Sequence, residues 1–334
     1  MFLAGLPGPM DEPTGHATAD VADASDRCDA VLAEVERAVI ADRSFLQTVL
    51  LGVLARGHVL LEDVPGTGKT LTARSIATAL GLSFSRIQFT PDLLPTDVTG
   101  THVFDERDRT FEFKEGPIFA NVVLADEINR APPKTQSALL EAMEERQVTA
   151  DGETRELPSP FFVIATQNPV EQEGTFSLPE AQVDRFAVKA TMGYPSYEDE
   201  AELLYRRASR EERSPSVEPV LSAEAVRALQ RVPETVRVDD DLVHYILEIC
   251  RATREDPRVS IGVSPRGTQR LFETARARAV IDGRTYVTPD HVKTVAGPVL
   301  AHRLVLTADA RVNGVRKSRV IEDVLGRVAV PTID

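Results

Sequence analysis

The chain of 334 residues lacks tryptophan, has only two cysteines and has only six lysines among its 38 basic residues. Cys28 and Cys250 are far apart in the sequence and belong to no CxxC motif or cysteine–histidine cluster. Two buried thiols in a reducing cytoplasm therefore fit this sequence better than a disulfide framework.

Long apolar runs are also missing from the sequence. The longest, Thr48 to Ala55, is too short to cross a bilayer. The first four residues are apolar, but they lack the basic segment of a secretion signal, and Asp11 and Glu12 follow soon after. We therefore expect a cytoplasmic protein without membrane insertion.

Basic residues are too few to balance the acidic ones, so the formal net charge is −14. Bulk binding to nucleic acid needs clustered Lys and Arg that neutralise phosphates, so this charge argues against a nucleic-acid partner, although a local basic patch is compatible with it. The length allows roughly two domains of about 150 residues each. The hydrophobic fraction of 42% is ordinary for a protein with packed cores.

The pattern along the chain predicts three segments. Residues 1–25 are rich in Pro, Gly, Ala and Asp without any period, which predicts a disordered leader. In residues 26–193, helical spacing is followed by short apolar strands that alternate with helices, which predicts an α/β core with a mostly parallel, doubly wound sheet. The predicted strands are His58–Glu62, Phe84–Phe89, Val122–Ala125, Phe161–Ala165 and Phe186–Met192.

Residues 194–334, after a turn at Gly193–Ser196, have an almost wholly helical pattern and predict a smaller all-α domain. Ser222 and Thr288 stand where a capping hydroxyl precedes a helix. The predicted helices are Tyr197–Ala208, Ser222–Arg231, Asp239–Arg254, Pro265–Ile281, Pro289–His302 and Ser318–Gly326.

A glycine-rich segment between a predicted strand and a predicted helix is the first candidate site. Its glycines allow backbone N–H groups to approach phosphate oxygens, and the helix amino terminus adds positive charge. Lys69 is expected to reach the β and γ phosphates, and the Thr70 hydroxyl to bind Mg²⁺. Asp63 stands where this motif usually has its first glycine, and the alternative is a glycine-rich turn with an exposed lysine. The expected phosphate-binding residues are Asp63, Val64, Pro65, Gly66, Thr67, Gly68, Lys69, Thr70 and Leu71.

Two further motifs follow later strands. Asp126 and Glu127 end an apolar strand, where one acid is expected to hold Mg²⁺ and the other to polarise an attacking water. Asn168 follows the next strand and is expected to orient water against the γ phosphate. Separately, these residues also fit solvated loop acids and an ordinary Asn-Pro turn. Their order along the chain favours a site for ATP and Mg²⁺, and the absence of an Asn-Lys-x-Asp motif favours adenine over guanine.

From about residue 30 to its end, the chain resembles the AAA+ ATPases of the MoxR family. This resemblance implies a P-loop AAA+ core with a parallel five-stranded sheet, an insert in its second helix and a helical lid. Residues Gly100–Phe113 fit the insert as a projecting hairpin, and Asp151–Gly152 predicts a second hairpin over Gln147–Leu157. Members of this family also have an aspartate at the position of Asp63, where the motif usually has its first glycine. The matching segments are Leu60–Thr70, Gln88–Asp97, Phe113–Phe119, Ala125–Lys134, Leu139–Glu145, Ala165–Pro169 and Leu178–Phe186.

The resemblance also implies a ring, usually a hexamer, with nucleotide at the interface between subunits. An arginine from the neighbour then serves the transferred phosphoryl group. Arg185 is the first candidate for this trans finger, Arg266 resembles the second sensor arginine, and Arg130 is a third candidate. The alternative for each is a surface ion pair. Relatives often have a Gly-Gln pair where this chain has Ala41–Asp42, which leaves the source of the adenine contacts open.

The leading functional hypothesis is an ATPase that remodels or assembles a protein partner, since relatives often act with proteins that carry a von Willebrand factor A domain. Related AAA+ groups with the same insert include nucleic-acid translocases, and the ATPase subunit of magnesium chelatase is another relative. A nucleotide-binding regulator with low turnover is the alternative outside enzymes.

Overall fold

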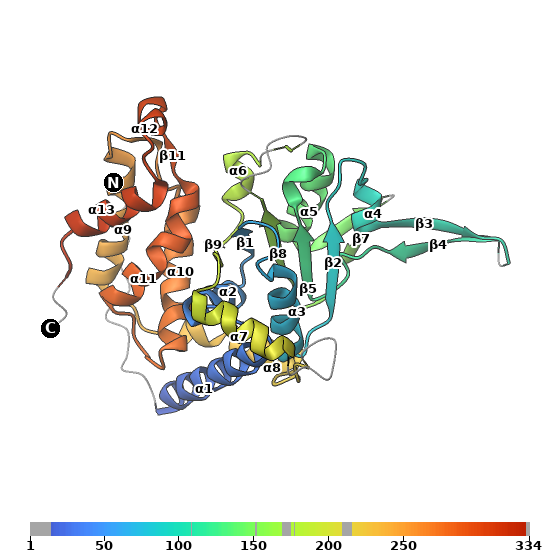
Figure 1. Cartoon of the computed structure of the whole chain (residues 1–334), viewed down its shortest axis with the longest axis horizontal. Coiled ribbons are helices and arrows are strands. Elements are labelled where there is room, and N and C mark those ends of the chain that lie inside the picture. The colour runs from blue at the N-terminus through green and yellow to red at the C-terminus, as the bar shows by residue number, and fades with distance from the viewer. Residues whose placement is uncertain are drawn as a thin grey trace, which may run out of the picture.

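The computed structural model describes residues 15–107, 109–150, 152–168, 175–176, 178–208 and 216–331, with side chains from Asp20 onward. Figure 1 shows an α/β part, from which a long hairpin projects, beside a helical part that contains most of the carboxyl-terminal third. None of the helices in these ranges is long and apolar enough to cross a membrane. The cytoplasmic location stays a prediction.

The α/β part is built on one parallel five-stranded sheet with the order β2-β5-β8-β1-β9. Every residue of β5 is buried, as expected for a central strand with helices on both faces. The fold class predicted from the sequence is confirmed. Because all five strands are parallel, their carboxyl ends share one edge of the sheet. The strands are β1 (Val59–Glu62), β2 (Phe84–Gln88), β5 (Val122–Asp126), β8 (Phe162–Gln167) and β9 (Val188–Ala190).

Alternate residues of the central strands face two separate hydrophobic cores. In β5, Val122 and Leu124 belong to the larger core, whereas Val123 and Ala125 belong to the smaller one. This division follows from the period of two in a strand. The larger core contains residues of α1 (Gly15–Ala38), α2 (Arg43–Leu54), α3 (Lys69–Ala79) and the helical part, and the smaller one contains residues of α5 (Pro133–Glu145).

The first helix corrects one prediction. α1 begins at Gly15, and Val21 and Ala24 are buried with only 1% and 2% exposure. Together with Cys28 and Val31 they form an apolar stripe at spacings of three and four residues, which packs in the larger core. The disordered leader predicted for residues 1–25 is therefore wrong from residue 15 onward, because this stripe is hidden among Ala and Asp. Residues 1–14 lie outside the described residues.

Both hairpins predicted from the sequence are present. β3 (Gly100–Asp105) pairs with β4 (Thr110–Glu115) after the short helix α4 (Pro95–Thr99), and the pair extends away from the sheet in Figure 1. β6 (Gln147–Ala150) pairs with β7 (Glu153–Glu156). Gly152 in their turn has φ +84°, a conformation that glycine adopts readily. Asp151 of this turn lies outside the described residues.

The helical part follows the predicted pattern closely. The hydroxyls of Ser222 and Thr288 accept the expected capping bonds, from the backbone N–H groups of Ala225 and His291. A short antiparallel pair, β10 (Val259–Ile261) with β11 (Val305–Leu306), was not predicted. The helices are α7 (Tyr197–Ala208), α8 (Ala223–Leu229), α9 (Asp240–Glu255), α10 (Pro265–Ile281), α11 (Pro289–Leu300), α12 (Ala308–Val312) and α13 (Lys317–Arg327), with 3-10 turns at Val232–Thr235 and Ala301–Arg303.

The segment around α8 also packs on the α/β part. The Val220 N–H donates to the Ala79 carbonyl at 2.8 Å, and Gln230 Nε2 donates to the Val53 carbonyl at 2.8 Å. The domain boundary after residue 193 stays a prediction. Beyond it, the chain returns to contact α3 at Ala79 and α2 at Val53. Cys28 and Cys250 are both buried and free, as predicted, and burial raises the pKa of the Cys28 thiol to about 12.

Candidate nucleotide site

The glycine-rich loop lies at the carboxyl edge of the sheet, between the end of β1 and the start of α3. Gly66 and Gly68 have φ values of +88° and +97°, the left-handed region that glycine enters without a steric penalty. Lys69 Nζ donates to the carbonyls of Val64 at 2.6 Å and Asp63 at 3.0 Å, so the ammonium group lies over the loop. Backbone N–H groups at the start of α3 are suited to an anion such as phosphate.

Asp63, the residue that departs from the usual motif, has a structural role. Its side chain is buried, and Oδ2 accepts bonds from the backbone N–H groups of Met192 at 2.7 Å and Gly193 at 2.8 Å. Oδ1 accepts from the Val64 N–H at 3.0 Å. A glycine could not make these contacts. The carboxylate therefore joins the phosphate loop to the chain that leaves β9.

Replacing Asp63 with alanine is expected to lower the free energy of unfolding by roughly 2–4 kcal/mol, because each buried N–H left without an acceptor costs about 1–3 kcal/mol. Urea denaturation measures this change. Asp63→Asn keeps one carbonyl oxygen and should lose less, and Asp26→Ala on the exposed side of α1 is the control. A loss below about 0.5 kcal/mol in Asp63→Ala, the range of ordinary surface substitutions, would contradict this role.

The two predicted acids lie at the end of β5, and Thr166 of the adjoining strand β8 contacts both. Thr166 Oγ1 donates to Asp126 Oδ1 at 2.6 Å and accepts the Glu127 N–H at 2.8 Å. Glu127 has φ +57°, a conformation that costs a non-glycine residue free energy and needs support from its surroundings. Thr166 gives that support, and it joins the Asp126 carboxylate to the backbone of Glu127.

Two polar residues of β2 contact these acids and were missed by the sequence analysis. Arg86 donates to Asp126 Oδ2 from Nε at 3.0 Å and from Nη2 at 2.6 Å. Gln88 Nε2 donates to Glu127 Oε2 at 2.8 Å, and Arg130 Nη1 reaches the same oxygen at 3.2 Å. The spacing of two between Arg86 and Gln88 was a signal that both side chains share one face of the strand, but only the pairing of β2 with β5 shows which residues they contact.

Asn168 follows β8 directly. The register pairs Glu62 of β1 with Gln167 of β8, so Asn168 lies at the same carboxyl edge as the phosphate loop. β5 pairs with β8 on its other side, through Ala125 and Ala165. The structure therefore brings Lys69, Thr70, Asp126, Glu127 and Asn168 to one edge of one sheet.

Arg185 lies elsewhere. It follows α6 (Glu180–Val183), and the Ala187 N–H just after it donates at 2.8 Å to the carbonyl of His58, which precedes β1. Arg185 is thus near the amino ends of the strands, whereas the phosphate loop follows their carboxyl ends. Its Nη1 donates to the Leu140 carbonyl at 2.7 Å, and its Nη2 pairs with Glu144 Oε2 at 3.2 Å.

Arg266, at the start of α10, lies beside Arg185. Both arginines pair with Glu144, and the hydrogen bond from Arg266 is the main cause of the lowered pKa of that carboxyl. Asp184 holds α10 in this position, since it accepts the Ser264 hydroxyl at 3.2 Å and pairs with the buried Arg303 at 2.8 Å. The structure therefore brings the two predicted arginines together but away from the phosphate loop of their own chain.

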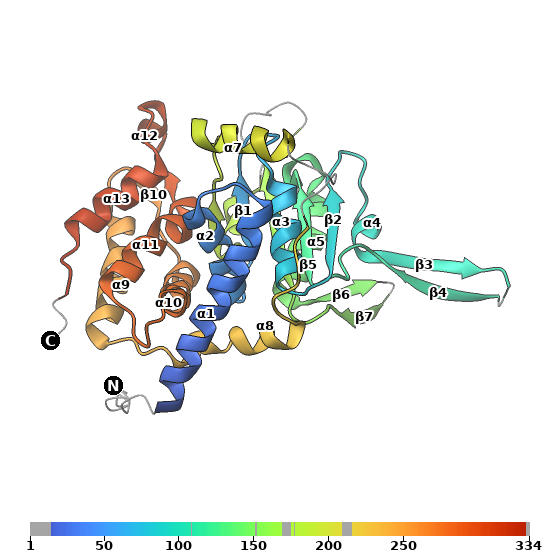
Figure 2. The same cartoon turned by 60° about the horizontal axis from the view of Figure 1, so that its bottom comes forward.

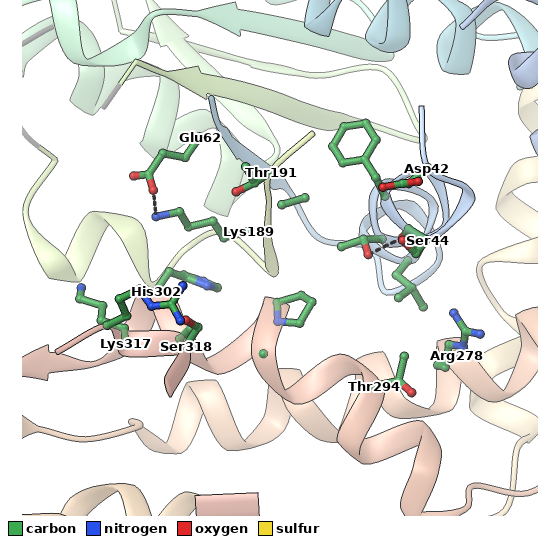
Figure 3. Close-up of a pocket in the computed structure, with 18 residues that line it drawn as sticks. Asp42, Ser44, Glu62, Lys189, Thr191, Arg278, Thr294, His302, Lys317 and Ser318 are labelled. Atoms are coloured by element: carbon green, nitrogen blue, oxygen red, sulfur yellow. Dashed lines mark hydrogen bonds and ion pairs between the residues drawn. The ribbon is translucent and has the colours of Figure 1, made fainter. Parts of the chain in front are cut away.

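A cavity of about 690 Å³ is lined by Glu62, the last residue of β1, which directly precedes the phosphate loop. Figure 3 shows Glu62 and Lys189 meeting on its sheet side, with Lys317 and His302 reaching in from the helical part. The Glu62–Lys189 ion pair is 2.6 Å long. Burial lowers the pKa of the Lys317 ammonium, and the nearby Lys189 lowers it further. Asp42 also lines this cavity, which is of a size typical for small-molecule sites.

These features define a class of protein. Residues 58–188 match the family described as the ATPase family associated with various cellular activities (AAA), and residues 251–324 match the AAA lid domain. A phosphate loop after one strand, paired acids after another, and a following lid are the parts of an AAA+ ATPase.

Comparison with individual proteins identifies the family. The chain is 49% identical to YeaC of Bacillus subtilis over 89% of this chain and 92% of that protein. It is 44% identical to the chaperone MoxR1 of Mycobacterium tuberculosis over 90% of this chain and 81% of that protein. It is 32% identical to MoxR of Paracoccus denitrificans over 80% of this chain and 86% of that protein. A crystal structure from Cytophaga hutchinsonii, of a protein assigned as an ATPase, superposes with a TM-score of 0.88 at 39% identity and covers 95% of this chain and 98% of that one. The chain belongs to the MoxR family of AAA+ ATPases, as its sequence motifs indicated.

Proposed function

We propose that this protein hydrolyses ATP with Mg²⁺ in a ring of identical subunits, usually a hexamer in this family, and uses the energy to remodel or assemble a protein partner. The observation that carries this proposal is the separation of the site into two halves. Lys69 and the acids Asp126 and Glu127 share one edge of the sheet, whereas Arg185 and Arg266 lie together near its other edge. Only a neighbouring subunit can join the halves.

Within one chain, Lys69 and the backbone of Asp63–Leu71 bind the phosphates. Glu127 polarises the attacking water, and Asn168 orients it. In the ring, Arg185 of the adjoining copy stabilises the charge on the transferred phosphoryl group, and Arg266 is the second sensor. The adenosine occupies the cavity beside Asp42, where the sequence left the base contacts open.

The Thr70 hydroxyl and the Asp126 carboxylate would hold Mg²⁺, which prefers oxygen ligands. One observation supports a cation at Asp126: its carboxylate is buried, and the Arg86 guanidinium neutralises Oδ2 in the position of a counterion. A metal held by these two residues would supply positive charge against the negative charge that develops on the phosphates during transfer. Arg86 must then share or release Asp126.

A protein partner is favoured over nucleic acid by the net charge of −14. The Mycobacterium relative is named a chaperone, and its high identity supports the same kind of role here. A protein with a von Willebrand factor A domain is the partner that membership of this family suggests.

The proposal is tested first at Lys69. Lys69→Ala is expected to reduce ATP turnover by roughly 100-fold or more, because an interaction with the transferred phosphates is lost. Phosphate release measures turnover, and a fluorescent ATP analogue measures affinity, which should also fall. Lys293→Ala on α11, which removes a lysine in a weak 3.9 Å contact with Asp290, is the control. Wild-type turnover in Lys69→Ala would exclude the assigned phosphate site.

A further inference from the structure

The helix α7 exposes an apolar face that needs a partner. Tyr197, Ala201, Leu204 and Ala208 follow the spacing i, i+4, i+7 and i+11, which places them on one side of the helix. Tyr197 is 82% exposed and Leu204 is 72% exposed. No residue of α7, all of which the structure describes, is buried. A helix of this length is marginal in water unless its apolar face packs against something.

Acidic residues flank this apolar face. The first turn of α7 contains Glu198, Asp199 and Glu200. Asp199 caps the helix by accepting the Ser196 hydroxyl at 2.9 Å, whereas Glu198 and Glu200 are exposed on either side of the stripe. A surface that receives α7 should therefore be apolar at its centre and basic at its rim.

A cavity of about 910 Å³ at the junction of α2, α9, α10 and the 3-10 turn Val232–Thr235 has this chemistry, and we name it the arginine cavity. Its apolar lining includes Leu54, Val243, Ile246, Leu247 and Phe272. Five arginines line it against two glutamates, in a chain whose net charge is −14. The arginines are Arg56, Arg146, Arg254, Arg270 and Arg276.

The glutamates of the arginine cavity do not neutralise all of its arginines. Glu234 pairs with Arg56 at 3.0 Å, and Glu273 pairs with Arg270 at 2.8 Å. Arg276 Nε is buried and has no hydrogen-bond partner among the described residues. Burial lowers the pKa of Arg146, and the nearby positive charges of Arg56 and Arg270 lower it further. The arginine cavity therefore has excess positive charge that carboxylates of another molecule can neutralise.

The two surfaces lie on different sides of the chain. α7 follows the carboxyl end of β9, near the nucleotide site, whereas Arg56 precedes β1 and Arg146 follows α5, near the amino ends of the strands. In Figure 2, α7 lies at the top beside the start of α3, and α8, α9 and α10 lie lower. One chain cannot bring them together. A head-to-tail contact between two copies can, and repetition of such a contact closes a ring.

We propose that α7 of one subunit docks its apolar stripe into the arginine cavity of the next copy, with Glu198 and Glu200 facing the cavity arginines. This inference rests on the proposed ring and names the surfaces that form it. The contact places the nucleotide side of one subunit against the side of its neighbour that carries Arg185 and Arg266. Charge complementarity selects a second copy as the occupant, since both surfaces belong to this chain.

Charge reversal tests the contact. One variant carries Glu198→Arg and Glu200→Arg, and a second carries Arg146→Glu and Arg270→Glu. Each alone places like charges opposite each other, which costs several kcal/mol, so the concentration for half-assembly should rise at least roughly tenfold. An equal mixture of the two variants should assemble again, because subunits that alternate have opposite charges at every contact. Sedimentation velocity with Mg²⁺ and ATP measures assembly.

The controls separate docking from folding and from the proposed function. Each variant should keep the affinity for a fluorescent ATP analogue, which shows that it folds, and Glu322→Arg on the exposed face of α13 should assemble normally. If single variants assemble like the wild type, or if the mixture fails to recover, the docking is excluded. If the wild type itself stays monomeric with ATP, the proposed ring is excluded instead.

Discussion

Replacing Arg185 with alanine is expected to lower kcat for ATP hydrolysis by roughly 10³- to 10⁵-fold, the usual contribution of an arginine finger. The affinity of a subunit for ATP should change little. The reason is geometric: Arg185 contacts Leu140 and Glu144 near the amino ends of the strands, whereas Lys69 follows their carboxyl ends. In the proposed ring, Arg185 therefore acts on the nucleotide of the next subunit.

Mixed assemblies provide the measurement. Arg185→Ala subunits have an intact phosphate loop, and Lys69→Ala subunits have an intact arginine. Turnover by a mixture should exceed that of either variant alone, because a Lys69→Ala subunit supplies Arg185 to its neighbour. Arg319→Ala, which removes an exposed arginine of α13, is the matched control. A mixture with no recovery, or a loss of ATP affinity in Arg185→Ala alone, would assign Arg185 to a role within its own subunit.

Glu127→Gln is expected to lower kcat by roughly 10²- to 10⁴-fold, the range for loss of a general base. The amide cannot take a proton from water, but it is nearly the same shape as the carboxylate. It retains an oxygen that accepts the bonds from Gln88 and Arg130, and the backbone bond between Glu127 and Thr166 does not depend on the side chain. ATP should therefore bind and stay unhydrolysed.

The measurement combines single-turnover hydrolysis with ATP binding. Glu141→Gln, an exposed glutamate of α5, is the matched control and should hydrolyse ATP normally. The Glu127→Gln variant held with ATP should also retain its protein partner in a pull-down better than the wild type does. Hydrolysis within threefold of the wild type would exclude Glu127 as the residue that activates water.

The structure corrects the sequence analysis where distant contacts decide the result. The apolar stripe of α1 was missed because Val21 and Ala24 lie among Ala and Asp, and only their contacts within the larger core show that this segment is part of the fold. Both hairpins predicted from the sequence are present in the structure. Their positions follow from short-range turn chemistry, such as Gly152 at a positive φ.

The sequence by itself determined the strand, phosphate loop and helix around Lys69, the acids Asp126 and Glu127 at the end of a buried strand, and most helices of the lid. These features depend on residues that are neighbours in the chain, where spacing, capping and glycine dihedrals act directly. Membership of the MoxR family also followed from such local motifs.

Only the tertiary structure decided the remaining features. Asp63 is bound by Met192 and Gly193, more than a hundred residues later in the chain. Arg86 meets Asp126 because β2 pairs with β5. Arg185 and Arg266 come together on Glu144. Strand order and the packing of the lid set these contacts, and no local pattern in the sequence specifies which distant residues will meet.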